Sequence, residues 1–320
     1  MLNINYNDLR AIKAHFKQSG NESWILLFPG GAGDTYLVST LLSAFFSTHN
    51  VFGRPLNLVL SHRQSFIPRM FSFPHQMLSI TNEERIWVQC RLWSPPPFFD
   101  PDHPYPLHPS FIGDGDNIRL MEHPNFTVLD VFRFVLKIPF ESSAELPIIS
   151  NMCKEEAELF ANKMGILRGE SAILFPSSRT IPSPKFEFWI QLANKLSSSG
   201  LKVFCNRLPG ETCIPGTFPI DFPLNIAIPL CNYAGFTVST LTGTAQITST
   251  SSASKAIVIL HEDKSTLIQN QNGLVTTNDN RIWTMKKIGL PFSGTEFFVS
   301  NTDNFFIEAS RIVSSLLAGY

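Results

Sequence analysis

Cysteine is scarce in this sequence, and its spacing suggests no metal centre. The chain has 5 cysteines among 320 residues, and no two of them are spaced as CxxC. An odd number without such a pair is typical of a reducing compartment. We therefore expect no zinc site.

Long apolar runs are also missing. No stretch approaches the roughly 20 apolar residues that cross a bilayer. At the amino terminus, Asp8, Arg10, Lys13 and Lys17 interrupt the sequence, so it lacks the apolar core of a signal peptide. The expectation is a cytoplasmic protein.

Neither sign of charge prevails. The formal net charge is -1, and only 16% of the residues are charged. Without an overall basic field, the composition argues against nucleic acid as a partner.

What the sequence does contain is enough apolar material for sizeable cores. Hydrophobic residues make up 43% and aromatic residues 12% of the 320 residues, with 28 phenylalanines. This composition is that of a well-packed globular protein, and the length allows two domains of roughly 150 residues each.

The most informative stretch is residues 24–38. An apolar run ends in a glycine cluster that includes Gly31 and Gly33, Asp34 follows at once, and the apolar spacing then becomes helical. This pattern predicts a buried strand, a tight loop and a helix, the first βα unit of an open α/β sheet. Ligands of such sheets collect outside the carboxyl ends of the strands. Asp34 is therefore a candidate general base, although an acid before an apolar helix is also a common helix cap.

The rest of the chain reads as two α/β halves, 1–150 and 151–320, with a cleft between them. In the second half, the pattern of strand, loop and helix begins again after a linker at 141–151. The predicted first-half elements are helices at 3–17 and 125–136, strands at 56–60 and 85–92, and a helix with a connection at 62–80. The predicted second-half elements are helices at 154–164, 186–198, 242–254 and 304–317, and strands at 171–175, 201–206, 235–239 and 256–260.

A family resemblance becomes specific in the second half. Residues 173–179, 184–196 and 200–204, with a second loop in 235–260, resemble the donor domain of heptosyltransferase-like glycosyltransferases (glycosyltransferase family 9-like). The resemblance extends to Gly33-Asp34 and covers about half of the chain. It implies a GT-B fold: two Rossmann-like domains facing across a cleft, an acceptor domain at 1–150 and a nucleotide-sugar donor domain at 151–320. The final helix could pack back on the first domain.

The same resemblance implies a function. The chain would be an inverting, metal-independent glycosyltransferase that moves a hexosyl or heptosyl group from a nucleotide sugar to a hydroxyl of a bacterial surface glycan or its lipid-linked precursor. Asp34 corresponds to the family's catalytic base. The nucleotide sugar is a co-substrate, and no cofactor or metal is implied. A peripheral contact with the inner face of the membrane is left open.

Physical roles for the donor site follow from the departing diphosphate, which cations and helix amino termini stabilise. Arg179 could grip phosphate with two parallel hydrogen bonds, whereas Lys185 would act as a point charge. The competing interpretation is ordinary, because Ser and Thr cap helices and cations lie in solvent. The predicted ligand-binding residues are Gly31, Gly33, Ser177, Ser178, Arg179, Lys185, Asn206, Thr242, Gly243 and Thr244.

The sequence departs from the family in the second donor loop. Related loops place an acid before the Ser/Thr-Gly pair and a histidine three residues after the glycine, where this chain has Leu241 and Gln246. An altered donor, or lost activity, would explain this. Two alternatives therefore stand beside the transferase: a non-catalytic module that binds a glycan or protein, and a sugar-nucleotide epimerase or hydrolase.

Other signals are weaker. Residues 31–33 resemble the start of a dinucleotide fingerprint, but Tyr36 occupies the place of the third glycine, which argues against nicotinamide binding. The acidic pairs in 100–102 and 114–116 resemble metal motifs, but they lie among turn-forming residues. His103, His108 and His123 lack a metal-ligand spacing.

Overall fold

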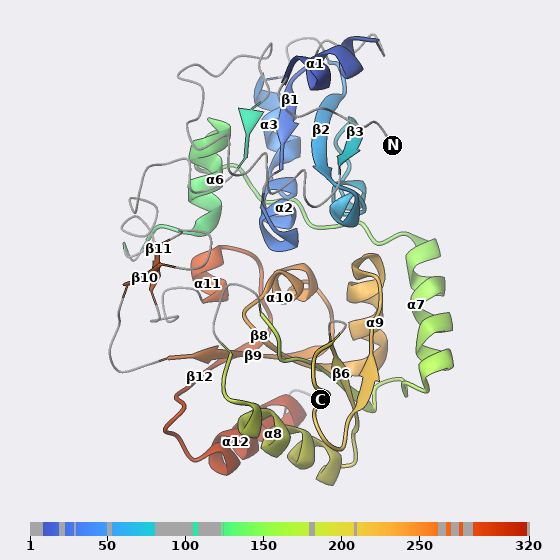
Figure 1. Ribbon diagram of the computed structural model, residues 1–320, viewed down its shortest axis with the longest axis vertical. Helices are drawn as coiled ribbons and strands as arrows, with labels where there is room; N and C mark the ends of the chain where they lie inside the picture. Colours follow the sequence, from blue (N-terminus) through green and yellow to red (C-terminus); the bar gives the residue numbers. More distant parts are fainter. Residues whose placement is uncertain are drawn as a thin grey trace. The chain divides into compact units, whose positions relative to one another are not determined.

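The computed structural model describes residues 9–18, 23–28, 30–49, 53–80, 105–107, 123, 125–178, 183–207, 210–261, 267–269, 275–277 and 284–318. Contacts within the chain divide it into two compact units, Met1–Ile148 and Ile149–Tyr320. Each unit is built on a parallel sheet with helices packed against it (Figure 1). The sequence-based boundary was residue 150.

The first unit has a four-stranded sheet in the order β3-β2-β1-β4. Its strands are Ile25–Leu27 (β1), Leu56–Ser61 (β2), His75–Ile80 (β3) and Tyr105–Pro106 (β4), and its helices are Leu9–Gln18 (α1), Ala32–Ser39 (α2), Leu42–His49 (α3) and Val128–Leu136 (α6). Two short 3-10 helices, His62–Gln64 (η1) and Pro68–Met70 (η2), connect β2 to β3.

The central strands of the first sheet are buried along their whole length. Every residue of β1 and β2 is buried, which fits the apolar run of β1 and the mainly apolar sequence of β2, where Asn57 and Ser61 are buried polar exceptions. Helix α1 covers one face, where Ile12 and Phe16 join a core with residues of β1, β2 and β3. On β4, the Tyr105 hydroxyl donates to the Val135 carbonyl of α6 at 2.9 Å.

Most of the segment predicted as a linker is fastened to the first unit. Glu145 accepts hydrogen bonds from the hydroxyls of Ser43 and Ser72, and its own N–H donates to the Thr40 carbonyl at 2.7 Å. The Ile148 N–H donates to the Met70 carbonyl, also at 2.7 Å. The chain therefore leaves the first unit only at the end of this segment.

The second unit has a six-stranded parallel sheet in the order β12-β9-β8-β5-β6-β7. Its strands are Ser171–Phe175 (β5), Lys202–Asn206 (β6), Phe218–Ile220 (β7), Gly235–Thr240 (β8), Ser254–Leu260 (β9) and Thr295–Val299 (β12). Its helices are Asn151–Met164 (α7), Phe186–Ser198 (α8), Ala227–Ala234 (α9), Gly243–Thr248 (α10), Met285–Ile288 (α11) and Phe305–Ala318 (α12), with a 3-10 turn at Leu224–Ile226 (η4). A separate antiparallel pair joins Leu267–Gln269 (β10) and Val275–Thr277 (β11).

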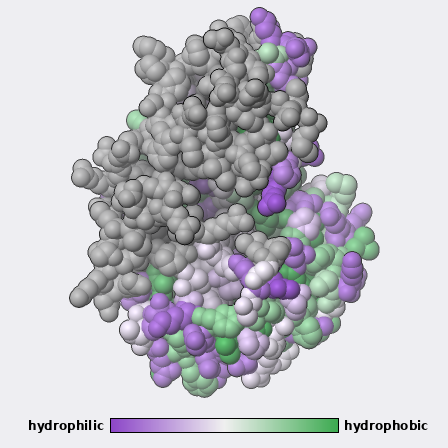
Figure 2. Space-filling model, in the orientation of Figure 1, coloured by the Kyte–Doolittle hydropathy of each residue, from purple (hydrophilic) through white to green (hydrophobic). Residues whose placement is uncertain are grey.

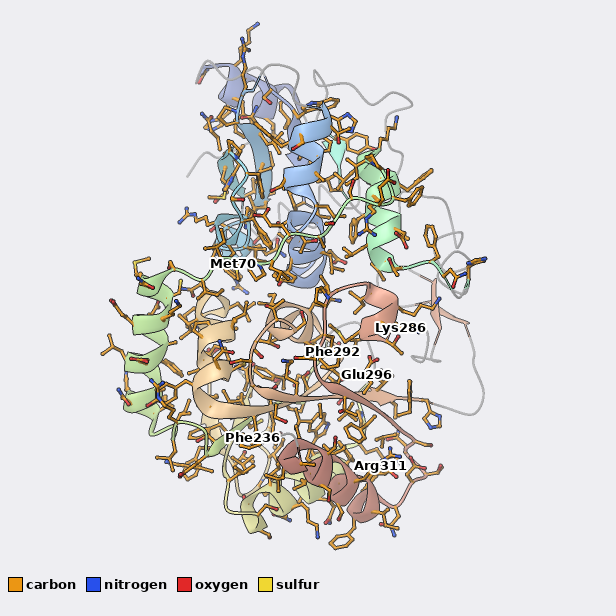
Figure 3. The ribbon with its side chains drawn as sticks, turned by 180° about the vertical axis from the view of Figure 1, so that it is seen from behind. Met70, Phe236, Lys286, Phe292, Glu296 and Arg311 are labelled. Carbon is orange, nitrogen blue, oxygen red and sulfur yellow. The ribbon has the colours of Figure 1, made fainter. Side chains whose placement is uncertain are left out.

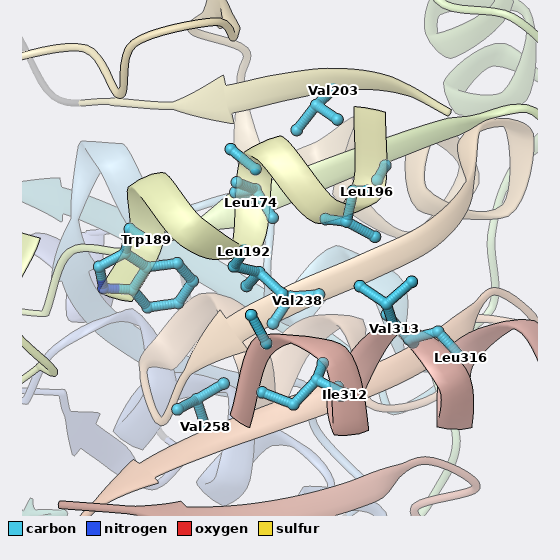
Figure 4. Packing of buried hydrophobic residues seen from close by; sticks show 14 of the residues in the cluster. Leu174, Trp189, Leu192, Leu196, Val203, Val238, Val258, Ile312, Val313 and Leu316 are labelled. Atoms are coloured by element: carbon cyan, nitrogen blue, oxygen red, sulfur yellow. The ribbon is translucent and has the colours of Figure 1, made fainter. Parts of the chain in front are cut away.

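Helices α8 and α12 lie side by side on one face of the second sheet (Figure 4). Trp189 and Leu192 of α8 meet Ile312 and Val313 of α12 over Val238 of β8 in one buried cluster. The apolar face of α12 is thus used within the second unit.

On the part of the second unit's surface that Figure 2 colours, hydrophobic and hydrophilic side chains are interspersed. No helix in the described part of the chain is both long enough and apolar enough to span a bilayer.

Several predicted elements are confirmed and others need correction. Nine elements lie where the sequence predicts them: strands β2, β5, β6, β8 and β9, and helices α6, α7, α8 and α12. The helix predicted within 62–80 is wrong, because that stretch holds two 3-10 turns and then β3. Helix α10 ends at Thr248 rather than near residue 254. The strand predicted at 85–92 lies outside the described residues.

Candidate functional site

The loop after β1 lies at the point where the strand order of the first sheet reverses. Strand β1 pairs with β2 on one side and with β4, much later in the chain, on the other. At such a switch point the connections leave in opposite directions and open a crevice at the carboxyl ends of the strands. Residues Gly30 to Asp34 occupy this position.

Asp34 is half-buried in the first turn of α2. Its Oδ2 accepts a hydrogen bond of 2.9 Å from the N–H of Gly31, the N-cap residue. In a capping box, the side chain of the third helical residue accepts the backbone N–H of the N-cap residue, and Asp34 makes this bond. The carboxylate therefore caps the helix without being the N-cap residue. No residue that the structure describes donates to its Oδ1. One carboxylate oxygen therefore holds the helix terminus, and the other can take a proton.

Gly30 must be glycine for Asp34 to lie where it does. A Cβ at Gly30 would be 2.6 Å from Asp34 Cβ and 2.7 Å from Asp34 Oδ2, whereas a Cβ at Gly31 would only reach ordinary contact at 3.7 Å. Sequence reasoning singled out Gly31 and Gly33 and missed Gly30. Both predicted glycines lie in the first unit with Asp34, whereas the other predicted ligand residues belong to the second unit.

The second sheet has its own switch point between β5 and β8. If the six strands are renumbered 1 to 6 along the chain, starting at β5, they lie across the sheet in the order 3-2-1-4-5-6. This is the strand order of doubly wound nucleotide-binding domains. Strands β5 and β8 are parallel neighbours, with Phe175 opposite Ser239. The loops that follow, 176–178 and 241–242, therefore leave the sheet side by side at its carboxyl edge.

The predicted residues of the first donor loop have modest contacts. Ser177 is exposed and Ser178 half-buried just after β5. Lys185 is the exposed N-cap residue of α8, and its N–H donates to Asn301 Oδ1 at 3.1 Å. No described acid pairs with its ammonium group. Asn206 ends β6, the strand next to β5. Arg179 lies outside the described residues.

The loop that the sequence predicts to be the second donor loop opens α10. Thr242 is the N-cap, and its hydroxyl accepts a hydrogen bond of 3.1 Å from the N–H of Ala245. Gly243 and Thr244 form the first turn and are half-buried. Leu241, where the family resemblance leads one to expect an acid, is 1% exposed and belongs to the core. The side-chain oxygen Oε1 of Gln246 is buried without a hydrogen-bond partner.

A carboxylate that sequence reasoning missed lies beside the first donor loop. Glu211 Oε2 accepts a hydrogen bond of 2.9 Å from the Ser177 hydroxyl, and the backbone carbonyl of Glu211 accepts one from Arg207 at 3.0 Å. Glu211 follows β6, the second strand of its sheet. An acid after the second strand is where doubly wound domains bind ribose hydroxyls. The place of Glu211 a few residues after the predicted strand 201–206 was the feature of the sequence that could have identified it.

Three buried titratable groups of the second unit, Cys205, Cys231 and Lys255, are unsuited to catalysis. Burial raises the pKa of the Cys205 thiol to about 11 and that of Cys231 to about 12, so both stay protonated near neutral pH. Burial also lowers the pKa of Lys255. Its ammonium donates to the carbonyls of Ser251 and Ala253 and to the Ser293 hydroxyl, so all three of its protons are engaged.

Within the described ranges, no three His, Cys, Asp or Glu side chains lie close enough together to hold a metal ion. The acidic pairs in 100–102 and 114–116, together with His103 and His108, lie outside those ranges. The described His123 is exposed.

Comparison with known proteins identifies the architecture. No protein-family model matches the sequence, and no curated protein does either. Solved structures do match over most of the chain. A glycosyl transferase family 9 protein from Veillonella parvula DSM 2008 has a TM-score of 0.58 and 10% identity, covering 94% of this chain and 98% of the other. The E. coli ADP-heptose lps heptosyltransferase II has a TM-score of 0.57 and 11% identity, with 92% and 99% covered.

A third match carries a nucleotide. The E. coli heptosyltransferase WaaC, solved with ADP, has a TM-score of 0.50 and 11% identity, covering 91% of this chain and 96% of the other. At these identities the likeness is one of fold. The chain therefore has the two-sheet α/β architecture of the GT-B heptosyltransferases.

Proposed function

We propose that this protein is an inverting, metal-independent glycosyltransferase that moves a sugar from a nucleotide-sugar donor to a hydroxyl of a bacterial surface glycan or its precursor. The observation that carries the proposal is the pair of loops at the switch point of the second sheet, between β5 and β8, which carry Ser177, Ser178 and Thr242. The same fold holds ADP in a heptosyltransferase.

In this proposal the second unit binds the donor. The departing nucleoside diphosphate gathers negative charge, which the first N–H groups of α10 and the Lys185 ammonium would stabilise. Arg179 would grip phosphate with parallel hydrogen bonds. Glu211 would accept hydrogen bonds from ribose hydroxyls, since a carboxylate suits a diol and repels a phosphate.

The first unit would activate the acceptor. Asp34 Oδ1 takes the proton of the acceptor hydroxyl as its oxygen attacks the anomeric carbon. The new carbon–oxygen bond forms while the bond to the diphosphate breaks, and the diphosphate leaves with the electron pair. A single displacement of this kind inverts the anomeric centre. The hydrogen bond from Gly31 to Oδ2 keeps the carboxylate in place during the transfer.

One observation favours a second function, a glycan- or protein-binding module without catalysis. Leu241 is in the core and Gln246 replaces a histidine, so two positions that are polar in related loops cannot contribute the usual groups here. A module of this kind would bind its glycan equally well with and without nucleotide.

Calorimetric titration of the full chain with ADP, UDP and GDP tests the donor site. We expect one of these nucleotides to bind and Thr242→Val to weaken its binding about fivefold, because the variant lacks the hydroxyl that would donate one hydrogen bond of about 1 kcal/mol to the diphosphate. Thr127→Val is the matched control, because Thr127 caps α6 in the first unit through the same type of bond, 3.2 Å from the N–H of Asp130. This control should leave the affinity unchanged.

Two results would count against the proposal. One is no binding of any nucleoside diphosphate at millimolar concentration. The other is equal weakening by both threonine variants, which would indicate a general loss of stability. Product analysis without an acceptor would separate transfer from epimerisation, which needs none.

A further inference from the structure

Gln64 is a buried amide for which the proposed chemistry has no use. It lies in η1 after β2 and is 7% exposed. Its Nε2 donates a hydrogen bond of 3.0 Å to the carbonyl of Gly30, 34 residues earlier in the chain. Its Oε1 is buried and has no partner. Burying an amide whose oxygen has no hydrogen-bond partner is unfavourable. The presence of Gln64 at this buried position therefore calls for an explanation, and its side-chain bond to Gly30 offers one.

The bond to Gly30 acts on the same peptide unit that holds Asp34. The Gly30 carbonyl and the Gly31 N–H belong to one planar trans peptide, and they point in opposite directions. Gln64 holds the carbonyl end of this plane. The N–H end donates to Asp34 Oδ2 at 2.9 Å. Because neither flanking residue has a Cβ, the Gly30–Gly31 peptide can rotate at little steric cost unless one end is anchored.

We infer that Gln64 is a positioning residue: by fixing the Gly30–Gly31 peptide it keeps the Gly31 N–H on Asp34 Oδ2 and leaves Oδ1 facing the acceptor. The catalytic part of this inference rests on the proposed role of Asp34 as the base. The structural part, that Gln64 orients the peptide, stands without it.

Gln64→Met is the variant of choice. Methionine matches the length and volume of glutamine and lacks the donor, and the substitution also removes the unpartnered Oε1, so the fold should hold. Asn57→Leu is the matched control. Asn57 is likewise a buried amide of the first unit. Its side chain also donates to a backbone carbonyl 34 residues earlier, that of Ser23 at 3.2 Å, but near the start of β1.

Two measurements on the full chain decide the matter. Amide hydrogen exchange followed by NMR should show the Gly31 N–H exchanging about tenfold faster in Gln64→Met and unchanged in Asn57→Leu. In transfer assays, kcat should fall about tenfold while KM for the donor stays within about twofold, because the donor loops lie in the other unit.

The outcomes are distinguishable. Faster exchange with lower kcat supports the inference. Faster exchange in a protein whose wild type transfers no sugar supports the orienting role while the proposed function fails. Unchanged Gly31 exchange overturns the whole inference. Faster exchange with unchanged kcat, in a protein that transfers sugar, overturns its catalytic part.

Discussion

The Asp34 oxygen that caps α2 is not the oxygen that we propose as the base. Oδ2 caps α2 through Gly31, and no described residue donates to Oδ1. The alternatives of cap and base therefore do not exclude one another. A base held by a capping bond is pre-oriented, which reduces the cost of reaching the reactive geometry.

Asp34→Asn should separate these two roles. An asparagine oxygen still accepts the Gly31 N–H, so we expect a change of less than about 1 kcal/mol in the free energy of unfolding. Without a carboxylate to take the proton, kcat should fall by about 100-fold or more. The measurements are thermal unfolding, the transfer rate and nucleotide affinity, which should stay within about twofold.

Asp130→Asn is the control for this change. Asp130 holds the same third position of α6 and accepts the N–H of Thr127 at 2.8 Å, so it caps in the same way without lying at the first switch point. Equal loss of transfer in both variants would mean that helix capping, and not proton transfer, accounts for the effect. Full turnover in Asp34→Asn would remove Asp34 from the base role.

At this scale the sequence could identify only what is local. Asp34 and the glycines are contiguous with a strand and a helix, so their pattern is visible in the sequence. Gln64 and Glu211 matter through hydrogen bonds to Gly30 and Ser177, each 34 residues away, and no short-range pattern encodes such pairs. Leu241 could be seen as a departure, but its place in the core could not.

At the scale of elements, buried strands and amphipathic helices were predictable and marginal ones were not. Strand β3 is partly exposed at the edge of its sheet, and its residues include His75, Gln76 and Ser79, so it forms because β2 pairs with it. Helix α9 was not predicted; its Pro229 lies in the first turn, where a helix tolerates proline. Helix α10 stops early in a run of serine and threonine, which are weak helix formers.

The contact between β12 and α11 predicts a pH dependence of stability. Glu296 lies beside α11 (Figure 3), and its Oε1 accepts the N–H of Met285 at 2.5 Å. Burial raises the pKa of Glu296 above its ordinary value of 4.5, more than this hydrogen bond lowers it. The folded state therefore binds the proton more tightly than the unfolded state does. The stability that this proton contributes is present below pH 4.5 and is lost as the pH rises through the raised pKa.

Glu296→Gln should remove this dependence. The amide oxygen can still accept the Met285 N–H, and no charge has to be buried. We expect the variant to gain stability relative to wild type between pH 4 and pH 7, by less than about 1 kcal/mol because the side chain is only partly buried. Denaturant unfolding at several pH values measures the difference. Glu155→Gln, at an exposed position of α7, controls for the loss of one negative charge. A constant difference between Glu296→Gln and wild type across this range would contradict the prediction.

At the scale of the whole molecule, the two units differ in what they can do alone. The second unit has a continuous core in which α8 and α12 pack on the sheet. It also contains both loops of its own switch point, after β5 and after β8. The first unit holds Asp34 and its supporting peptide. The sequence predicted this division from the restart of the strand–helix pattern, which is a property of order along the chain and needs no long-range contact.

The fragment 149–320 should therefore fold and bind nucleotide by itself. Its chain includes the linker's end, all six strands of the second sheet and the helices that cover them, so burial of Trp189, Leu192 and Ile312 does not depend on the first unit. We expect a single cooperative unfolding transition and a nucleotide affinity within about threefold of the full chain, with no sugar transfer, because Asp34 is absent. Leu192→Ala in the fragment should cost about 2–5 kcal/mol, as for a buried leucine in a packed core. If the full chain binds nucleotide but a cooperatively folded fragment does not, the donor site requires residues of the first unit, and the assignment of donor binding to the second sheet alone is wrong.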